Sequence, residues 1–289
     1  MITEFHTTDL VSRCFKRVQL RHQGKIIPEV ASAMFRGLLI HHHLECWHID
    51  KAASYGHVLD SIKAEGRQLT PAALRDVAET NEEAIALTAL YAKRYKDFFA
   101  KSELLGVEVP LRWSGIDVDG KPVDFATHLD LLFRDPSGVL CDWDWKTGDT
   151  DWDGEHANRS LQFGMQFMAI QYGQVMLQGE WIDLRESPHI RVVNIDNLKP
   201  YSRRTMGKDI NGEDFEYVKG DEKPEWSIGR EQLITNESGI LEQFATKVRM
   251  SRLNLWPMNP TDTGCRACEC RKHCPTWTSD EKETADEGI

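Results

Sequence analysis

The sequence lacks any apolar run that approaches the length of a membrane-spanning helix, which excludes proteins that cross a bilayer by helices. Residues 1–13 also lack the basic and apolar regions of a secretory signal peptide. An excess of positive charge is missing as well, since 35 Lys and Arg residues stand against 46 Asp and Glu residues, a net charge of −11 at pH 7. This balance argues against a general nucleic-acid-binding surface and leaves only local contacts with phosphate. We therefore expect a cytoplasmic protein that makes no membrane contact.

The composition is otherwise that of a soluble globular protein, with 40% hydrophobic and 28% charged residues. A chain of 289 residues holds one large domain or two small ones. Disulfides are rare in the cytoplasm, so we expect the seven cysteines to be metal ligands or core residues.

A tight turn at residues 135–138 joins two strand-like runs in the middle of the chain. Its sequence, Asp-Pro-Ser-Gly, puts Pro and Gly where a type I turn favours them. The first strand carries Asp130 among apolar residues. On the second strand the side chains alternate between two faces, so Asp142, Asp144 and Lys146 share one face.

Carboxylates that face a shared site repel each other unless a cation lies between them. Mg²⁺ is suited to that position, because it binds through one or two carboxylates together with water and phosphate oxygens. A neighbouring lysine can then orient or activate a water, or stabilise a developing negative charge. The alternative is a surface hairpin with a solvated charged face. Against it stand the apolar neighbours of the aspartates, which are Leu129, Leu131, Leu132, Phe133, Val139, Leu140, Trp143 and Trp145.

Asp130, the turn and the run Asp-Trp-Lys-Thr-Gly at 144–148 together resemble the core of the PD-(D/E)XK nuclease superfamily. The ending, an aspartate, an aromatic residue and Lys-Thr-Gly, is similar to the RecB-type branch of that superfamily. The resemblance implies an α/β fold of the restriction-endonuclease type, in which helices flank a central mixed sheet. The sequence departs from the family at Thr127, where a glycine usually stands three residues before the first aspartate.

Residues 28–66 are predicted to form one long helix, either continuous or interrupted, and His41 lies on its apolar side. A hydrogen-bonded core histidine is one interpretation of this position. RecB-type nucleases, however, carry a helix with the pattern G-x-x-x-H followed by Leu-Glu, which Gly37, His41, Leu44 and Glu45 match. The resemblance implies that His41 is a metal ligand or lies next to one, and favours the two following histidines less.

Three more polar residues correspond to family positions. Glu108 lies on the predicted strand 105–116, where the family often has a glutamate before the first aspartate, although an exposed strand glutamate is the alternative. Gln162 and Gln166 lie four residues apart on one face of the predicted helix 156–174. RecB-type enzymes place a glutamine on this helix, so either residue is a candidate, and ordinary polar helix residues are the alternative.

Four cysteines occur within ten residues near the C-terminal end, at Cys265, Cys268, Cys270 and Cys274. Their polar neighbours argue against burial in a core, and thiolates at this density coordinate metal. All four could form a zinc site. The spacing C-x₂-C-x₅-C, which leaves Cys270 extra, instead resembles the iron–sulfur RecB-type nucleases, including CRISPR-associated exonucleases and AddB-like nuclease domains. That resemblance implies a [4Fe–4S] cluster held by Cys14, Cys265, Cys268 and Cys274, which joins the two chain ends.

We expect one nuclease domain over 1–289. Its parts are an N-terminal cluster segment (1–27), a helical part with His41 (28–100), a nuclease core (101–197), an irregular insertion (198–230), and a C-terminal helix with the cysteine cluster (231–289). Two further helices are expected, one from about 70 to 99 with a break near 80–81, and one over 232–255 with a break near 238–239.

The resemblance implies a metal-dependent DNA nuclease, in particular an exonuclease on single-stranded or end-exposed DNA. Asp130, Asp144 and His41 would bind Mg²⁺ or Mn²⁺, Lys146 would position or activate the attacking water, and a glutamine of the next helix would assist. A helicase or recombination protein is the expected partner besides DNA. The alternative is a non-catalytic subunit for DNA-end binding or assembly that keeps a structural iron–sulfur or zinc site. The sequence does not distinguish exonuclease from endonuclease, the polarity of digestion, or DNA from RNA.

Overall fold

The computed structural model describes residues 4–10, 18–20, 23–24, 29–148, 159–198, 204–208, 214–218, 225–253 and 255. Within these ranges no helix is both long and apolar enough to cross a membrane.

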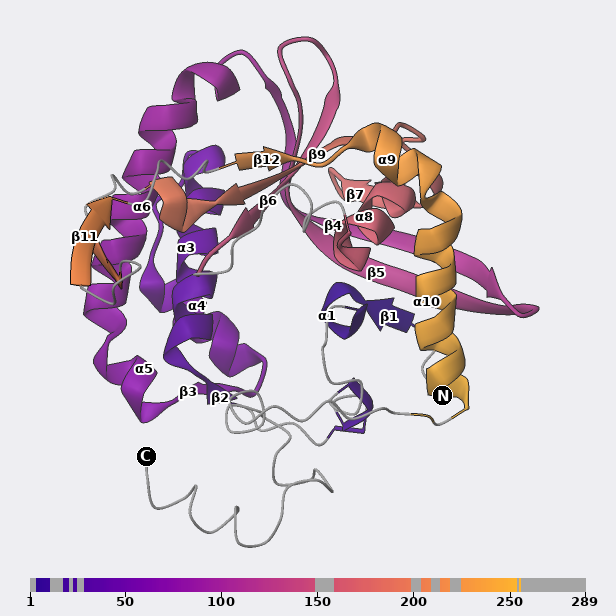
Figure 1. Ribbon diagram of the computed structural model, residues 1–289, viewed down its shortest axis with the longest axis horizontal. Helices are drawn as coiled ribbons and strands as arrows, with labels where there is room; N and C mark the ends of the chain where they lie inside the picture. Colours follow the sequence, from indigo (N-terminus) through magenta and orange to yellow (C-terminus); the bar gives the residue numbers. More distant parts are fainter. Residues whose placement is uncertain are drawn as a thin grey trace, which may run out of the picture.

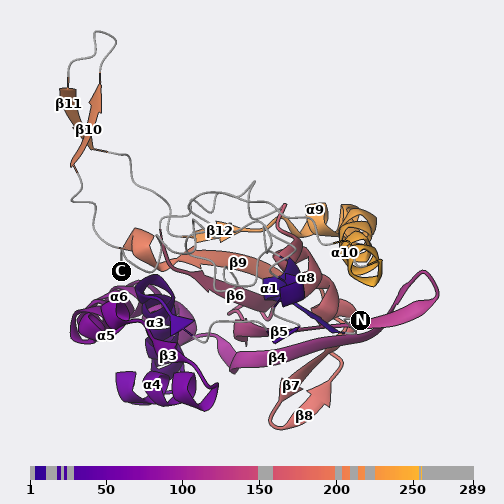
Figure 2. The same ribbon diagram turned by 90° about the horizontal axis from the view of Figure 1, so that it is seen from below.

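An eight-stranded sheet forms the centre of the molecule, and helices lie on both of its faces (Figure 1, Figure 2). The strand order is β12 (Glu225–Ser227), β9 (His189–Asn194), β6 (Leu140–Lys146), β5 (Lys121–Arg134), β4 (Glu103–Val118), β7 (Gln174–Leu177) and β8 (Glu180–Ile182), with β1 (Glu4–His6) also paired to β5. The β6–β9 and β1–β5 pairs are parallel and the others are antiparallel. The predicted mixed α/β fold with a central sheet is confirmed, and the sheet is mostly antiparallel.

Local turn chemistry sets the two hairpins that build the middle of the sheet. Between β4 and β5, the Asp117 carboxylate accepts a hydrogen bond from the Gly120 N–H at 2.7 Å. Between β5 and β6, one carboxylate oxygen of Asp135 accepts from the N–H groups of Ser137 and Val139 at 2.8 and 3.0 Å. Aspartate at the start of a turn favours this geometry, and the turn at 135–138 lies where the sequence predicted it.

The helical part covers one face of the sheet. It comprises α3 (Ser32–His48), α4 (Tyr55–Ala64), α5 (Pro71–Arg75) and α6 (Val77–Phe99), with the short parallel pair β2 (Glu29–Val30) and β3 (Gln68–Leu69). Trp143 and Trp145 of β6 point to this face, and both are buried. Tyr91 of α6 packs edge-on against Trp145, and Tyr95 packs against Trp143, with ring centroids 6.2 and 5.1 Å apart. These aromatic rings supply much of the apolar area buried on this face.

The opposite face is covered by α1 (Thr7–Leu10), α8 (Leu161–Tyr172), α9 (Arg230–Thr235) and α10 (Glu237–Arg252). Helix α8 is almost wholly buried between the sheet and α10. At Gly164 of α8, a Cβ atom would lie only 2.9 Å from the Ile240 side chain of α10, so the two helices approach closely through this glycine.

The observed helices are shorter than the predicted ones. The two predicted breaks lie a few residues away from the observed ones. The expected helix 28–66 is two helices, α3 and α4, separated by residues 49–54. Helices α5 and α6 are divided at Asp76 instead of 80–81, and α9 and α10 at Asn236 instead of 238–239.

The prediction of an irregular segment over 198–230 is wrong for the part that the structure describes. Strands β10 (Arg204–Lys208) and β11 (Asp214–Val218) form an antiparallel pair, and β12 extends the central sheet. A 3₁₀ turn, η1 (Ile195–Leu198), follows β9. The strand residues Thr205, Phe215 and Tyr217 favour β structure, but charged neighbours hide the alternating pattern in the sequence.

Candidate active site

A fork between β5 and β6 gathers most of the predicted site residues. The ladder between these strands runs from the Arg134–Leu140 pair to the Leu131–Trp143 pair and ends there. One residue further, the Asp130 Oδ2 atom accepts a hydrogen bond from the Trp145 N–H at 2.6 Å. A side-chain carboxylate thus takes the place of a backbone acceptor where the strands separate.

Helix α3 brings His41 to this fork. The His41 Nδ1 atom lies 3.6 Å from Asp130 Oδ1, and the two side chains are 25% and 15% exposed. The imidazole also packs edge-on against the buried Trp145 ring, with centroids 5.7 Å apart. Its approach to both residues is fixed by the packing of α3 on the sheet.

Glu108 of β4 lies across the ladder from Asp130 and completes a group of three. One ligand atom each from His41, Glu108 and Asp130 lies within 4.8 Å of the others. Glu108 has a φ of +46°, in the left-handed region, although it is neither glycine nor in a turn. Such a backbone costs on the order of 1–3 kcal/mol, and residues of this kind are concentrated at functional sites.

Electrostatics at the fork are dominated by carboxylates. Burial, together with the nearby Asp130 and Glu45, raises the pKa of Glu108 to about 8. Burial also raises the pKa of Glu45 on α3, and the two glutamates share a hydrogen bond. Carboxyl groups that must share a proton in this way mark a place where a divalent cation would be stabilised.

Beside this group, Asp144, Lys146 and Gln162 form a second set of contacts. The Lys146 Nζ atom lies 2.6 Å from Asp144 Oδ2, and Gln162 Nε2 donates a hydrogen bond to Asp144 Oδ1 at 2.8 Å. Gln162 Oε1 in turn accepts from Lys146 Nζ at 3.5 Å. Burial raises the pKa of Asp144 to about 6, and Lys146 opposes that rise. The three side chains form a closed arrangement that fixes the position of the lysine.

A sequence profile described as "PD-(D/E)XK nuclease superfamily" matches residues 7–275. The chain belongs to this superfamily. Nucleases of the superfamily use divalent metals such as Mg²⁺ and act on DNA, and the His41, Glu108 and Asp130 group is able to bind such a metal.

Comparison with solved structures gives a weaker relationship. Fifteen chains match significantly. One of them is a crystal structure of the protein SSO0001, with a TM-score of 0.43, 15% sequence identity, and coverage of 96% of this chain and 88% of that one. No curated protein matches the sequence significantly. The superfamily assignment therefore depends on the sequence profile.

Within this superfamily member, the structure separates the two candidate glutamines. Gln162 contacts Asp144 and Lys146, whereas Gln166 lies one helical turn further along α8 and is 2% exposed. The Gln166 Oε1 atom has no hydrogen-bond partner among the described residues. Of the pair, Gln162 is the residue in contact with the candidate site.

Two acidic residues beside the candidate site were not predicted as site residues from the sequence. Asp142 is fully buried, and neither carboxylate oxygen has a hydrogen-bond partner within the described ranges. Burial, with Asp144 next, raises its pKa far above the ordinary value. Its position on the same strand face as Asp144 could have predicted that it lies near the site. For Glu45, the only sequence signal was its place at the end of the His41 pattern.

The remaining predicted residues divide into two groups. His42 and His43 make other contacts. His42 stacks on His57, and His43 makes a hydrogen bond with Asn81 at 3.1 Å. Cys14, Cys265, Cys268, Cys270 and Cys274 lie outside the described residues, so the predicted cluster stays a prediction. Cys46 and Cys141 are buried free thiols.

Proposed function

We propose that this chain is a metal-dependent deoxyribonuclease that hydrolyses phosphodiester bonds in single-stranded or end-exposed DNA. The observation that carries the proposal is the meeting, at one fork in the sheet, of a group able to bind a metal and a lysine held by a buried aspartate. Superfamily membership supplies the chemical class.

The donor set fits a divalent cation. His41, Glu108 and Asp130 offer two carboxylates and one imidazole within 4.8 Å, and Asp144 adjoins them. Oxygen donors suit Mg²⁺ and Mn²⁺, and both ions tolerate the single nitrogen. When bound, such an ion lowers the pKa of a coordinated water and offsets negative charge on the scissile phosphate.

The protein's own residues supply position and charge. In this proposal Lys146 orients the attacking water or contacts the phosphate, and Asp144 and Gln162 fix where its ammonium group lies. Asp130 holds the Trp145 N–H and therefore the backbone that carries Lys146. Catalysis of this type depends mainly on positioning and electrostatic stabilisation.

The test is cleavage of end-labelled single-stranded DNA and blunt duplex DNA in Mg²⁺ and in Mn²⁺. We expect Lys146→Ala and Asp144→Asn to lower the single-turnover rate by about 10²–10⁴-fold while DNA binding persists. Lys63→Ala is the matched control, because Lys63 is an exposed lysine on α4, with a side chain 73% exposed. Wild-type protein that binds DNA ends without cutting them in either metal would instead support the non-catalytic subunit.

Circular single-stranded DNA decides between exonuclease and endonuclease. An exonuclease digests the linear strand and leaves the circle intact. Cutting of the circle would show endonuclease activity and refute the exonuclease part of the proposal. Strands labelled at the 5′ or the 3′ end then give the polarity of digestion.

We also propose that Cys14, Cys265, Cys268 and Cys274 hold a [4Fe–4S] cluster, on the support of their number and spacing. Anaerobic purification should give a brown protein with about four irons per chain, and Cys14→Ala should lose them. A colourless protein with one zinc that is indifferent to Cys14→Ala would identify the local zinc site instead.

A further inference from the structure

Arg36 lies outside the candidate active site but connects the two segments that carry it. We propose that Arg36 and Asp196 are positioning residues, which set helix α3, with His41, against the end of strand β6, with Lys146. This inference rests on the proposed function, because it concerns the arrangement of that same metal site.

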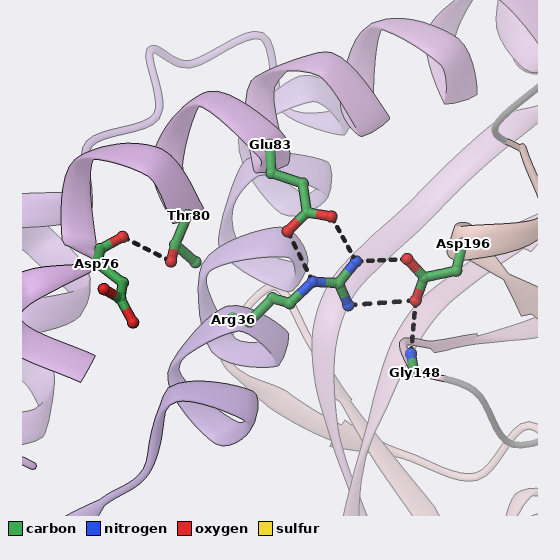
Figure 3. A network of polar contacts seen from close by, with 6 residues as sticks. All are labelled: Arg36, Asp76, Thr80, Glu83, Gly148 and Asp196. Atoms are coloured by element: carbon green, nitrogen blue, oxygen red, sulfur yellow. Dashed lines mark hydrogen bonds and ion pairs between the residues drawn. The ribbon is translucent and has the colours of Figure 1, made fainter. Parts of the chain in front are cut away.

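The contacts of Arg36 are shown in Figure 3, where its guanidinium lies between two carboxylates. On one side, Nε and Nη2 donate to the two oxygens of Glu83 on α6 at 2.8 and 3.0 Å. On the other, Nη1 donates to Asp196 Oδ2 at 3.1 Å and Nη2 donates to Asp196 Oδ1. Both carboxylates are therefore bound in the bidentate manner that arginine favours and lysine cannot reproduce.

Asp196 passes this contact on to the segment that follows the candidate lysine. Its Oδ2 atom accepts a hydrogen bond from the Gly148 N–H at 2.6 Å, two residues after Lys146 (Figure 3). Its own N–H donates to Asn194 Oδ1 at 3.0 Å, and Asn194 is the ladder partner of Lys146 in the parallel β6–β9 pair. Asp196 is thus bonded to the backbone two residues after the lysine and to the side chain of the residue that pairs with the lysine on β9.

A second contact joins the same two segments beside the first. Gly37 follows Arg36 on α3, and a Cβ atom at this position would lie 3.2 Å from the Thr147 Oγ1 atom. The helix and residues 147–148 are therefore in close contact at this point. His41 follows Arg36 by five residues, about 7.5 Å along the helix axis, so a shift of the helix here moves the imidazole as well.

Burial makes the network more than a surface ion pair. The side chains of Arg36, Glu83 and Asp196 are 21%, 32% and 20% exposed. Without Arg36, the guanidinium that lies between the two carboxylates is lost, and with it the contacts that join α3 to Glu83 and to Asp196. We expect α3 to withdraw from residues 147–148. A displacement of about 1 Å at a catalytic group costs on the order of 10²-fold in rate.

Two halves of the network separate positioning from stability. The Arg36–Glu83 half joins α3 to α6, whereas the Arg36–Asp196 half joins α3 to the end of β6. Glu83→Gln is therefore the matched control, because it weakens the network and leaves the contact to Gly148 in place. Asp196→Ala and Arg36→Met remove the half that reaches the site.

The experiment measures Mn²⁺ affinity by electron paramagnetic resonance and single-turnover cleavage with varied DNA concentration. We expect Arg36→Met and Asp196→Ala to weaken Mn²⁺ binding about tenfold and to lower the cleavage rate about 10–100-fold, with the DNA concentration for half-maximal rate unchanged. Arg36→Lys should recover part of both losses. Glu83→Gln should remain within about threefold of wild type in both measurements, although its Tm falls.

Two results would overturn the inference. One is wild-type Mn²⁺ affinity and rate in the Arg36→Met variant, and another is a loss in Glu83→Gln as large as that in Asp196→Ala. If Asp196→Ala does not fold, Asp196→Asn takes its place, because its side chain keeps an acceptor for the Gly148 N–H. The Arg36→Met measurement tests the role independently of either variant. A wild-type protein that neither binds Mn²⁺ nor cuts DNA would overturn the proposed function itself, so the two failures are distinguishable.

Discussion

His48 should make the protein sensitive to mild acid. It lies on α3 in the aromatic core, stacked on Trp145 at 5.7 Å between centroids and edge-on to Phe99 at 4.6 Å. Its Nε2 atom also makes a hydrogen bond with the Tyr91 hydroxyl at 3.1 Å. Burial lowers the pKa of this imidazole to about 3, so His48 stays neutral in the folded protein at pH 5.

The sign follows from proton binding. Between pH 6.5 and 3 the unfolded chain protonates this histidine and the folded chain does not, so the free energy of unfolding falls as the pH falls through 6.5. Above pH 6.5 this loss of stability is absent, because the histidine is neutral in both the folded and the unfolded chain. At pH 5.0, which is about 1.5 pH units below the unfolded pKa, the loss is about 2 kcal/mol. That value needs only a folded pKa well below 5.

The assay is urea unfolding at pH 7.5, 6.5, 5.5 and 5.0, followed by tryptophan fluorescence, for wild type and His48→Gln. The variant loses the ring contacts and should be less stable at pH 7.5 by about 1–2 kcal/mol. Because it no longer carries the titrating group, the difference between the two proteins should shrink by about 2 kcal/mol by pH 5.0. Phe133→Leu, which removes an aromatic ring from the same core and no titrating group, should leave the difference from wild type constant. A constant difference for His48→Gln as well would refute the argument.

Three other predictions concern the site and its support. Glu108→Gly should be more stable than Glu108→Gln by about 1 kcal/mol, because glycine relieves the positive φ, while both weaken Mn²⁺ binding; thermal unfolding and paramagnetic resonance measure the two effects. Gln162→Ala should lower the single-turnover rate by about tenfold or more, and Gln166→Ala should leave it within about threefold of wild type; equal losses would contradict the assignment. Gly164→Ala should lower the free energy of unfolding by about 1–3 kcal/mol, because its Cβ would press on Ile240, and an unchanged Tm would show that α10 shifts freely.

Local patterns predicted the parts of the fold that depend on neighbours in sequence. Aspartate, proline and glycine placed the turn at 135–138 correctly, and strand alternation put Asp144 and Lys146 together on one face, where they are in contact. The helix breaks were less predictable, because residues 49–54 between α3 and α4 contain neither proline nor glycine to mark an end.

The contacts that complete the site are long-range. Glu108 reaches the fork only because the β4–β5 register sets it across from Asp130 and its backbone is left-handed, and neither property has a local signature. Asp196 contacts Gly148 from 48 residues away, through the parallel pairing of β6 and β9. The sequence does not distinguish Arg36 from other arginines on helices, because its partners lie on α6 and η1. Only the tertiary structure reveals such contacts.

The Asp130 carboxylate has two roles, one at the candidate metal site and one in the sheet. One oxygen faces His41, and the other substitutes for a missing rung of the β-sheet. Anyone who wants an inactive protein for trapping DNA should therefore leave this aspartate intact, since its replacement would loosen the sheet as well as the metal site. Lys146 is the better position for such a trap, because its side chain contacts Asp144 and Gln162 at the candidate site, whereas the Asp130 side chain also holds the backbone of β6.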